Sequence, residues 1–156
     1  MAEIRIVPAN QDDVDYIANH LRLRDLEELR ASHGDDADAV HLLRLAVRLS
    51  DEAMVAVTAH GEPVAVFGVV PLSILTGDGR PWMLATDMAS RFRRELVIGG
   101  KHWTSVWGER YEALSNWVDA RNTPAIRWLE RIGYQIHDAV PYGPNGLPFH
   151  PFDRYA

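Results

Sequence analysis

The chain has 156 residues, of which 47% are hydrophobic and 24% charged, the mixture typical of one compact globular domain rather than of a disordered or fibrous protein. Its cysteine count is zero, which excludes a thiol nucleophile, a cysteine-bound metal and a disulfide framework. The formal charge of −6 argues against nucleic acid as a partner, because binding to phosphates requires a basic surface. We predict a single domain over residues 1–156.

No segment predicts a membrane span or a secretion signal. The longest apolar run, residues 64–72, is too short to cross a bilayer, and the N-terminal residues lack the basic and apolar regions of a signal peptide. We therefore expect a cytoplasmic protein.

The first half of the chain predicts a strand, two helices and three further strands. A strand over residues 4–7 leads to Asn10, which is placed to cap a helix whose apolar positions recur as far as Leu29, before Gly34 ends it. Aspartates at 35–38 begin a second helix. Residues 54–59 and 64–70 predict a central hairpin, and residues 81–87 predict the next strand.

The second half predicts a helical region over residues 90–111, which we expect to kink or break at Gly99–Gly100. A strand over 113–119 follows, then a helix with Thr123 as N-cap and Pro124 as its first residue. Residues 134–136 begin a strand. The proline-rich remainder, from about residue 138, predicts an irregular segment that contacts partners, with an edge strand at best.

This order, together with residues 119–134, resembles the GCN5-related N-acetyltransferase family. In that family a strand is followed by an asparagine, a small residue three positions later, a helix and a glycine-aromatic pair; these correspond here to Asn122, Ala125, Gly133 and Tyr134. The resemblance implies an α/β fold in which helices flank both faces of a mixed sheet. The segment also resembles the internal virion protein A group of short-tailed phages, which implies the host cytoplasm or incorporation into the virion.

Two positions depart from an active member of the family. Its glycine-rich loop, which lets backbone amides approach the pyrophosphate of acetyl-CoA, corresponds here to residues 87–95, which contain no glycine. The tyrosine that many members use as a general acid falls at Leu129, which has no proton to donate. We therefore expect no cofactor, and acetyl-CoA only if the chain is an enzyme.

The residues that would still carry this chemistry each have an ordinary structural alternative. Asp87 is our candidate for the base, or it caps the following helix. Arg91, Arg93 and Arg94 would hold the acetyl-CoA phosphates, or they form a solvated helix face. Asn122 would bond the pantetheine arm, or it satisfies loop amides.

The seven histidines contain no HxH pair and no HExxH motif, so the sequence predicts no metal site. Two functions remain open. The first is a non-catalytic phage protein, virion-associated or assembly-related, which binds a protein partner or itself. The second is an acetyl-CoA-dependent N-acetyltransferase with an unknown amine substrate. An acyl-CoA cleft that is fully formed favours the enzyme, whereas a cleft plugged by side chains favours the binding protein.

Overall fold

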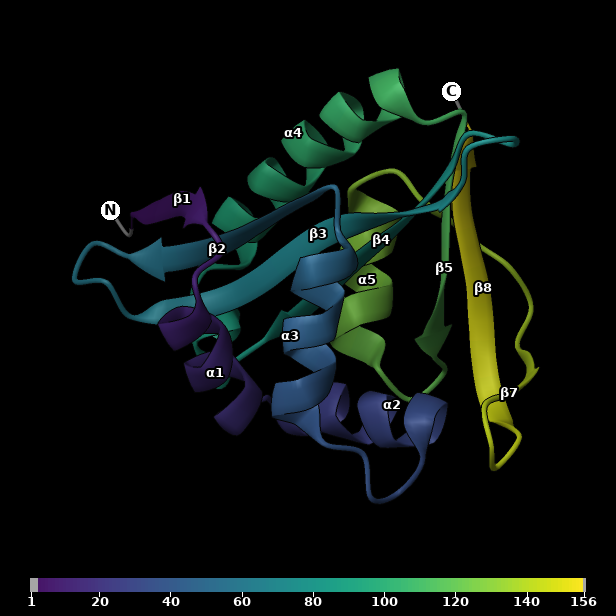
Figure 1. Cartoon of the computed structure of the whole chain (residues 1–156), viewed down its shortest axis with the longest axis horizontal. Helices are drawn as coiled ribbons and strands as arrows, with labels where there is room; N and C mark the ends of the chain where they lie inside the picture. Colours follow the sequence, from purple (N-terminus) through teal and green to yellow (C-terminus); the bar gives the residue numbers. More distant parts are fainter. Residues whose placement is uncertain (1–2, 156) are drawn as a thin grey trace.

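The computed structural model describes residues 3–155 and contains one mixed sheet with helices on both faces (Figure 1). The strands are β1 (Ile4–Pro8), β2 (Glu52–Thr58), β3 (Pro63–Ser73), β4 (Asp78–Ala85), β5 (Ala113–Asp119), β6 (Gln135–Ile136), β7 (Val140–Tyr142) and β8 (Leu147–Tyr155). The helices are α1 (Gln11–Asn19), α2 (Leu23–His33), α3 (Ala39–Leu49), the 3₁₀ helix η1 (Asp87–Arg91), α4 (Arg93–Arg110) and α5 (Thr123–Arg131). These elements confirm the predicted α/β architecture.

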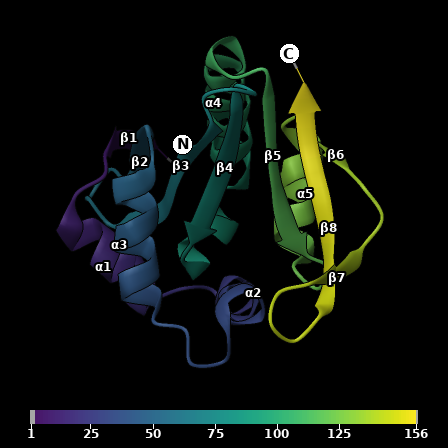
Figure 2. The same ribbon diagram turned by 45° about the vertical axis from the view of Figure 1, so that its right-hand side comes forward.

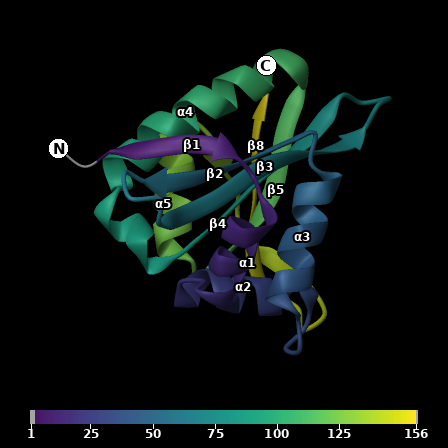
Figure 3. The same cartoon turned by 60° about the vertical axis from the view of Figure 1, so that its left-hand side comes forward.

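The sheet order is β1-β2-β3-β4-β5-β8-β6, with β7 also paired to β8. Helices α1 and α3 cover one face, where their apolar residues pack on β2 and β3 (Figures 1 and 3). Helices α4 and α5 cover the other face and pack on β5 and β8. Within residues 3–155, no helix is both long enough and apolar enough to span a membrane.

Strands β4 and β5 are parallel but pair only at their beginnings. Asp78 and Gly79 lie opposite Ala113 and Leu114, and beyond these residues the strands separate toward their carboxyl ends (Figure 2). Helix α2 lies across those separated ends. This divergence leaves one backbone edge of each strand available to groups other than a neighbouring strand.

The first predicted helix is two helices. Asn10 caps α1 as predicted, since its side chain accepts a hydrogen bond from the Asp13 backbone N–H, but α1 ends at Asn19. Leu21 then forms a bridge to Thr86, and the Arg22 backbone N–H donates to the Ala85 carbonyl. The break between α1 and α2 therefore follows from a contact with the end of β4. The spacing of apolar residues along the chain cannot predict that contact.

The predicted kink in the second long helical region is wrong, because α4 runs without a break through Gly99 and Gly100. A Cβ atom at Gly100 would lie 2.8 Å from side-chain atoms of both Trp128 and Ile132 on α5, whereas one at Gly99 would meet nothing within 4 Å. At Gly100 the absence of a side chain lets α4 and α5 approach closely.

The cap predicted for α5 is also wrong by one residue. Asn122, not Thr123, is the N-cap, and its Oδ1 accepts from the Ala125 backbone N–H at 3.4 Å. Thr123 is the first helical residue, and Gly133 follows the helix with a φ of 108°.

The C-terminal segment is regular rather than irregular, and β8 is not an edge strand. It pairs with β5 from Ala113–Tyr155 to Asp119–Phe149 on one side, and with β6 and β7 on the other. Its prolines still use their carbonyls: the Pro148 oxygen accepts from the Ala120 N–H and the Pro151 oxygen from the His137 N–H. Phe149 and Phe152 are buried, so this segment belongs to the core.

Candidate functional site

A cavity of about 380 Å³ lies where β4 and β5 separate. Its walls come from both strands, from α2 and α3 on one face of the sheet and from α4 and α5 on the other. One side-chain contact crosses the gap near the paired end, where the Asn116 Nδ2 donates to the Pro81 carbonyl at 2.9 Å. The cavity is mostly apolar, as small-molecule sites usually are.

Asp25 of helix α2 places a buried carboxylate at the carboxyl end of β4. Asp25 is 1% exposed, and its Oδ2 accepts from the Ala85 backbone N–H at 2.8 Å and from the Arg22 Nε at 2.8 Å. Its other oxygen accepts from the Asn122 Nδ2 at 3.0 Å. The Arg22 backbone N–H donates to the Ala85 carbonyl. The N–H and the carbonyl of Ala85, which both face the gap, therefore already have partners on or beside α2.

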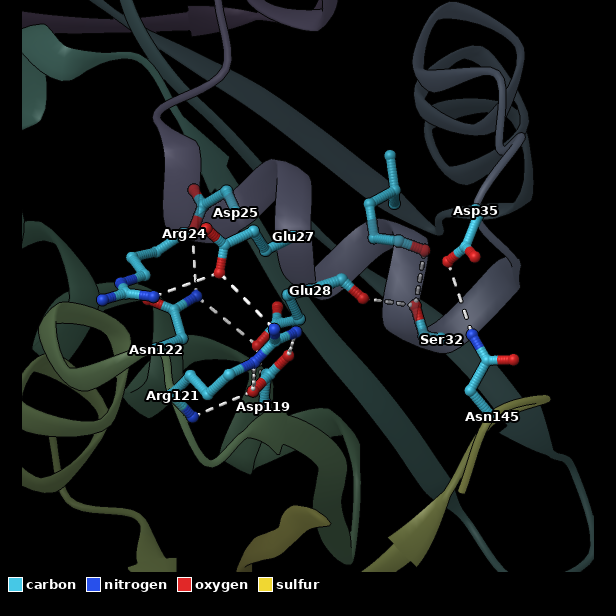
Figure 4. Close-up of polar contacts among 11 residues, drawn as sticks. Arg24, Asp25, Glu27, Glu28, Ser32, Asp35, Asp119, Arg121, Asn122 and Asn145 are labelled. Atoms are coloured by element: carbon cyan, nitrogen blue, oxygen red, sulfur yellow. Dashed lines mark hydrogen bonds and ion pairs between the residues drawn. The ribbon is translucent and has the colours of Figure 1, made fainter. Parts of the chain in front are cut away.

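A second acidic residue of α2 reaches the end of β5 (Figure 4). The Glu28 Oε1 accepts from the Asp119 backbone N–H at 2.7 Å. Glu28 is half-buried and lines the cavity, where the surrounding chain shields its carboxyl from bulk water. This burial raises the pKa of Glu28 to about 8, against the hydrogen bond from Asp119 and with a further rise from the charge of Asp25. At neutral pH Glu28 is therefore mainly protonated.

Asp119 remains ionised through its contacts with Arg121. Burial acts to raise the pKa of Asp119, but the side-chain and backbone hydrogen bonds of Arg121 outweigh it, and the net pKa is lowered. The Arg121 Nη2 lies 2.7 Å from Asp119 Oδ2, and its backbone N–H donates to Asp119 Oδ1 at 2.8 Å. The two carboxyl groups at the end of β5 therefore differ in charge at pH 7.

The loop after β4 is folded into η1, and most of its amides bond within it. The Thr86 side chain accepts from the Met88 N–H, the Thr86 carbonyl accepts from the Ala89 N–H, and the Ala89 carbonyl accepts from the Phe92 N–H. Thr86, rather than Asp87, is thus the cap of the following helix. A row of free amides facing a ligand is the usual phosphate cradle, and these three amides already have acceptors.

The residues predicted from the sequence fall in three places. Asp87 is exposed at the start of η1 and lines a separate hollow with Tyr16 and His20, not the cavity between the strands. The three arginines are exposed around the start of α4, with no ion pair to residues 3–155. They are Arg91, Arg93 and Arg94.

Asn122 is 1% exposed and joins α5 to α2, since its Oδ1 accepts from the Ala125 N–H and its Nδ2 donates to Asp25. Leu129 is buried beside the cavity. Tyr134 is buried too; burial raises its pKa to about 12, so this phenol stays protonated under ordinary conditions. Within residues 3–155, no three His, Asp or Glu side chains come together as a metal site.

Sequence reasoning missed Asp25, Glu28 and Arg80, which are among the polar groups of this region. Asp25 and Glu28 belong to a run of charged residues on a helix, which resembles a solvated face in the sequence. Arg80 stands between a turn and an apolar strand, and its surroundings depend on the separation of β4 from β5. Asp25 and Glu28 carry no local signal, because their contacts with Ala85, Asn122 and Asp119 join residues far apart in the chain.

The solved structures that resemble this chain include N-acetyltransferases. Ard1 from Thermoplasma volcanium is 22% identical with a TM-score of 0.72, covering 98% of this chain and 97% of that one. Spermidine N-acetyltransferase from Vibrio cholerae, in complex with CoA and spermine, is 12% identical with a TM-score of 0.70, covering 97% and 95%. A GCN5-related N-acetyltransferase from Kribbella flavida is 18% identical with a TM-score of 0.67, covering 98% of each chain.

The sequence itself matches no protein-family model and no curated protein. The structural matches nevertheless show that the chain has the fold of the GCN5-related N-acetyltransferases, as predicted. Fold alone does not determine activity, so the function has to be argued from the site.

Proposed function

We propose that this chain is a non-catalytic protein of the N-acetyltransferase fold, which acts by binding other proteins as a virion-associated or assembly-related component of a phage. The phage assignment rests on the resemblance of the segment around Asn122 to the internal virion protein A group. The non-catalytic assignment rests on the loop after β4.

The observation that carries the proposal is the folding of that loop into η1. In the family resemblance, glycines let backbone amides approach the pyrophosphate, but here the Met88, Ala89 and Phe92 amides have acceptors within the chain. A ligand that used these three amides would have to break their bonds and pass side chains that glycine would not carry. Binding of acetyl-CoA is therefore weak or absent.

Two further features support this view. Arg22 and Asp25 hold the backbone groups of Ala85, on the edge of β4 that a bound arm would have to pair with. Leu129 stands where the resemblance implies a general acid, and it cannot protonate a leaving thiolate. Transfer would need both a displaced α2 contact and another proton donor.

A second candidate, an active N-acetyltransferase, is favoured by the cavity of about 380 Å³ between β4 and β5. The Pro81 carbonyl and the Ala85 N–H face the gap, and by strand alternation Met83 turns its backbone N–H and carbonyl there too. The exposed arginines at the start of α4 would supply charge for phosphates. In this candidate Asp87 is the base.

Acetyl-CoA binding separates the two candidates. A ligand at 100 times its Kd stabilises a protein by about 2.7 kcal/mol, and each kcal/mol shifts the Tm of a chain this size by about 2–4 °C. We expect no shift with acetyl-CoA at about millimolar concentration. A rise in Tm that disappears in the double variant Arg93→Ala, Arg94→Ala would show that these arginines hold the phosphates. It would refute the proposal that acetyl-CoA binds weakly or not at all.

Turnover is tested separately by the release of free CoA thiol from acetyl-CoA in the presence of spermidine or a peptide amine. We expect no release above the rate without protein. Steady release that is abolished by Asp87→Asn would establish the enzyme and overturn the non-catalytic proposal. Asp35→Asn, which changes an exposed aspartate far along the chain, is the matched control.

A further inference from the structure

Arg80 contributes a buried cationic nitrogen that has no partner among residues 3–155. Its Nε is inaccessible to solvent and makes no hydrogen bond, and its guanidinium forms no ion pair within residues 3–155. Buried donors are almost always satisfied, because leaving one without an acceptor costs the desolvation of the group. Arg80 as a whole is half-buried, so its shielded Nε is the donor for which residues 3–155 supply no acceptor.

The position of Arg80 places it in the wall of the cavity between β4 and β5. Residues 80, 82 and 84 alternate onto the face of the sheet that α1 and α3 cover, since Trp82 and Leu84 belong to the apolar cluster of that face. The register of β4 with β5 then puts Ser115 and Trp117 on the same face. Arg80 therefore lies on the α3 side of the cavity.

The same side of the cavity is lined by flat aromatic groups that are fixed in place. The Trp82 Nε1 donates to the Ser50 Oγ at 2.8 Å, which holds its indole ring. Trp117 stacks on Tyr142 with a centroid separation of 4.5 Å and an interplanar angle of 13°. All three residues line the cavity. Such walls favour a planar apolar body, which packs against aromatic faces.

The charges around the cavity leave Arg80 free to bind an anion. Arg80 is the only arginine or lysine among the lining residues that the structure describes. The nearby carboxylates Asp51 and Glu52, at the same end of the sheet, already pair with Arg110. Of the two acidic lining residues, Glu28 is mainly protonated at neutral pH and Glu95 belongs to α4 on the opposite face.

We propose that this cavity binds a small organic acid whose carboxylate pairs with the guanidinium of Arg80 and whose flat apolar body packs between Trp82 and Trp117. The planar fork of a guanidinium matches a carboxylate with two parallel hydrogen bonds. The cavity of about 380 Å³ lies within the size range of small-molecule sites, about 300–1,000 Å³. The inference is independent of the proposed function, because it concerns an anion on the α3 side and not acetyl transfer.

The test compares two probes of the same ring and nearly the same shape, the anion 2-naphthoate and the neutral 2-naphthamide, by isothermal titration in the absence of acetyl-CoA. We expect 2-naphthoate to bind at one site with a Kd below about 1 mM and 2-naphthamide to bind at least about tenfold more weakly. Equal affinities for the two probes, or no saturable binding of 2-naphthoate, would overturn the proposal.

Variants then assign the charge to Arg80. Arg80→Met should weaken 2-naphthoate by at least about tenfold and leave 2-naphthamide unchanged, so the neutral probe also reports that the cavity is intact. Arg48→Met, which removes an exposed arginine on α3, should change neither. Trp117→Leu should weaken both probes alike. Retention of 2-naphthoate binding in Arg80→Met would show that the anion is held elsewhere.

Discussion

Asn122 joins three parts of the molecule through one side chain. Its Oδ1 caps α5, and its Nδ2 donates to Asp25, which in turn holds Ala85 at the end of β4. Asn122→Ala removes the cap, which should lower the free energy of unfolding by about 0.5–2 kcal/mol. It also leaves a buried carboxylate oxygen of Asp25 without its donor, which should lower it by about 1–3 kcal/mol more. Thr123→Ala should cost under about 0.5 kcal/mol.

Urea denaturation of the two variants measures this difference in the free energy of unfolding. Thr123 provides the matched control, because it is the adjacent residue and lies outside the hydrogen-bond network. A larger loss for Thr123→Ala than for Asn122→Ala would contradict the assignment of the cap.

Glu28 makes the stability of the fold depend on pH. Its pKa is 4.5 in a model peptide and about 8 in the folded chain, so the folded state holds a proton that the unfolded state has already released. Stability from this group is therefore full below pH 4.5 and is lost as the pH rises to about 8. Each unit of pKa difference is worth about 1.4 kcal/mol, so the full loss is a few kcal/mol.

Glu28→Gln should remove this loss, because glutamine keeps the oxygen that accepts from the Asp119 N–H and cannot ionise. We expect the variant to match the wild type near pH 5 and to exceed it in free energy of unfolding near pH 9. Glu27→Gln, on the same helix, is the control. Parallel pH profiles for the wild type and Glu28→Gln would show that Glu28 titrates normally.

At the scale of elements, the adjacent glycines Gly99 and Gly100 of α4 have opposite roles. Gly99→Ala should stabilise the protein by about 0.5–1 kcal/mol, because alanine loses less conformational entropy in a helix and the site is open. Gly100→Ala should destabilise it by about 1–3 kcal/mol through overpacking against α5. The neighbouring Trp128 cannot easily move, since its Nε1 donates to the Leu96 carbonyl.

Thermal melting of the two alanine variants tests this pair, each serving as the control for the other. Equal effects of the same sign would mean that the close approach of α4 to α5 is absent in solution. The comparison also explains why the predicted kink failed: propensity alone counts both glycines as helix breakers, whereas one of them permits a helix contact.

At the scale of the whole molecule, the sequence predicted elements better than contacts. The bounds of β5 and the α5 helix with Gly133 behind it follow from local patterns, and so does the cap at Asn10. The break after α1, the burial of Asp25 and the unpaired Arg80 depend on which strands separate. Those contacts join residues that are distant in the chain, and short-range periodicity does not encode them.

The C-terminal segment shows the same distinction most clearly and yields the last prediction. Its prolines suggested an appendage, yet β8 pairs with β5 on one side and with β6 and β7 on the other, and it buries Phe149 and Phe152. Deleting residues 141–156 would leave the edge of β5 unpaired and remove two core aromatics, each worth about 3–5 kcal/mol, which together approach the whole stability of an ordinary domain. We expect the truncated chain to lose its cooperative unfolding transition by circular dichroism. Removing only residues 155–156, where Tyr155 is 72% exposed, should leave that transition in place. A truncated chain that still unfolds cooperatively would mean that β5 and α5 hold together without β8, and that the segment is an appendage after all.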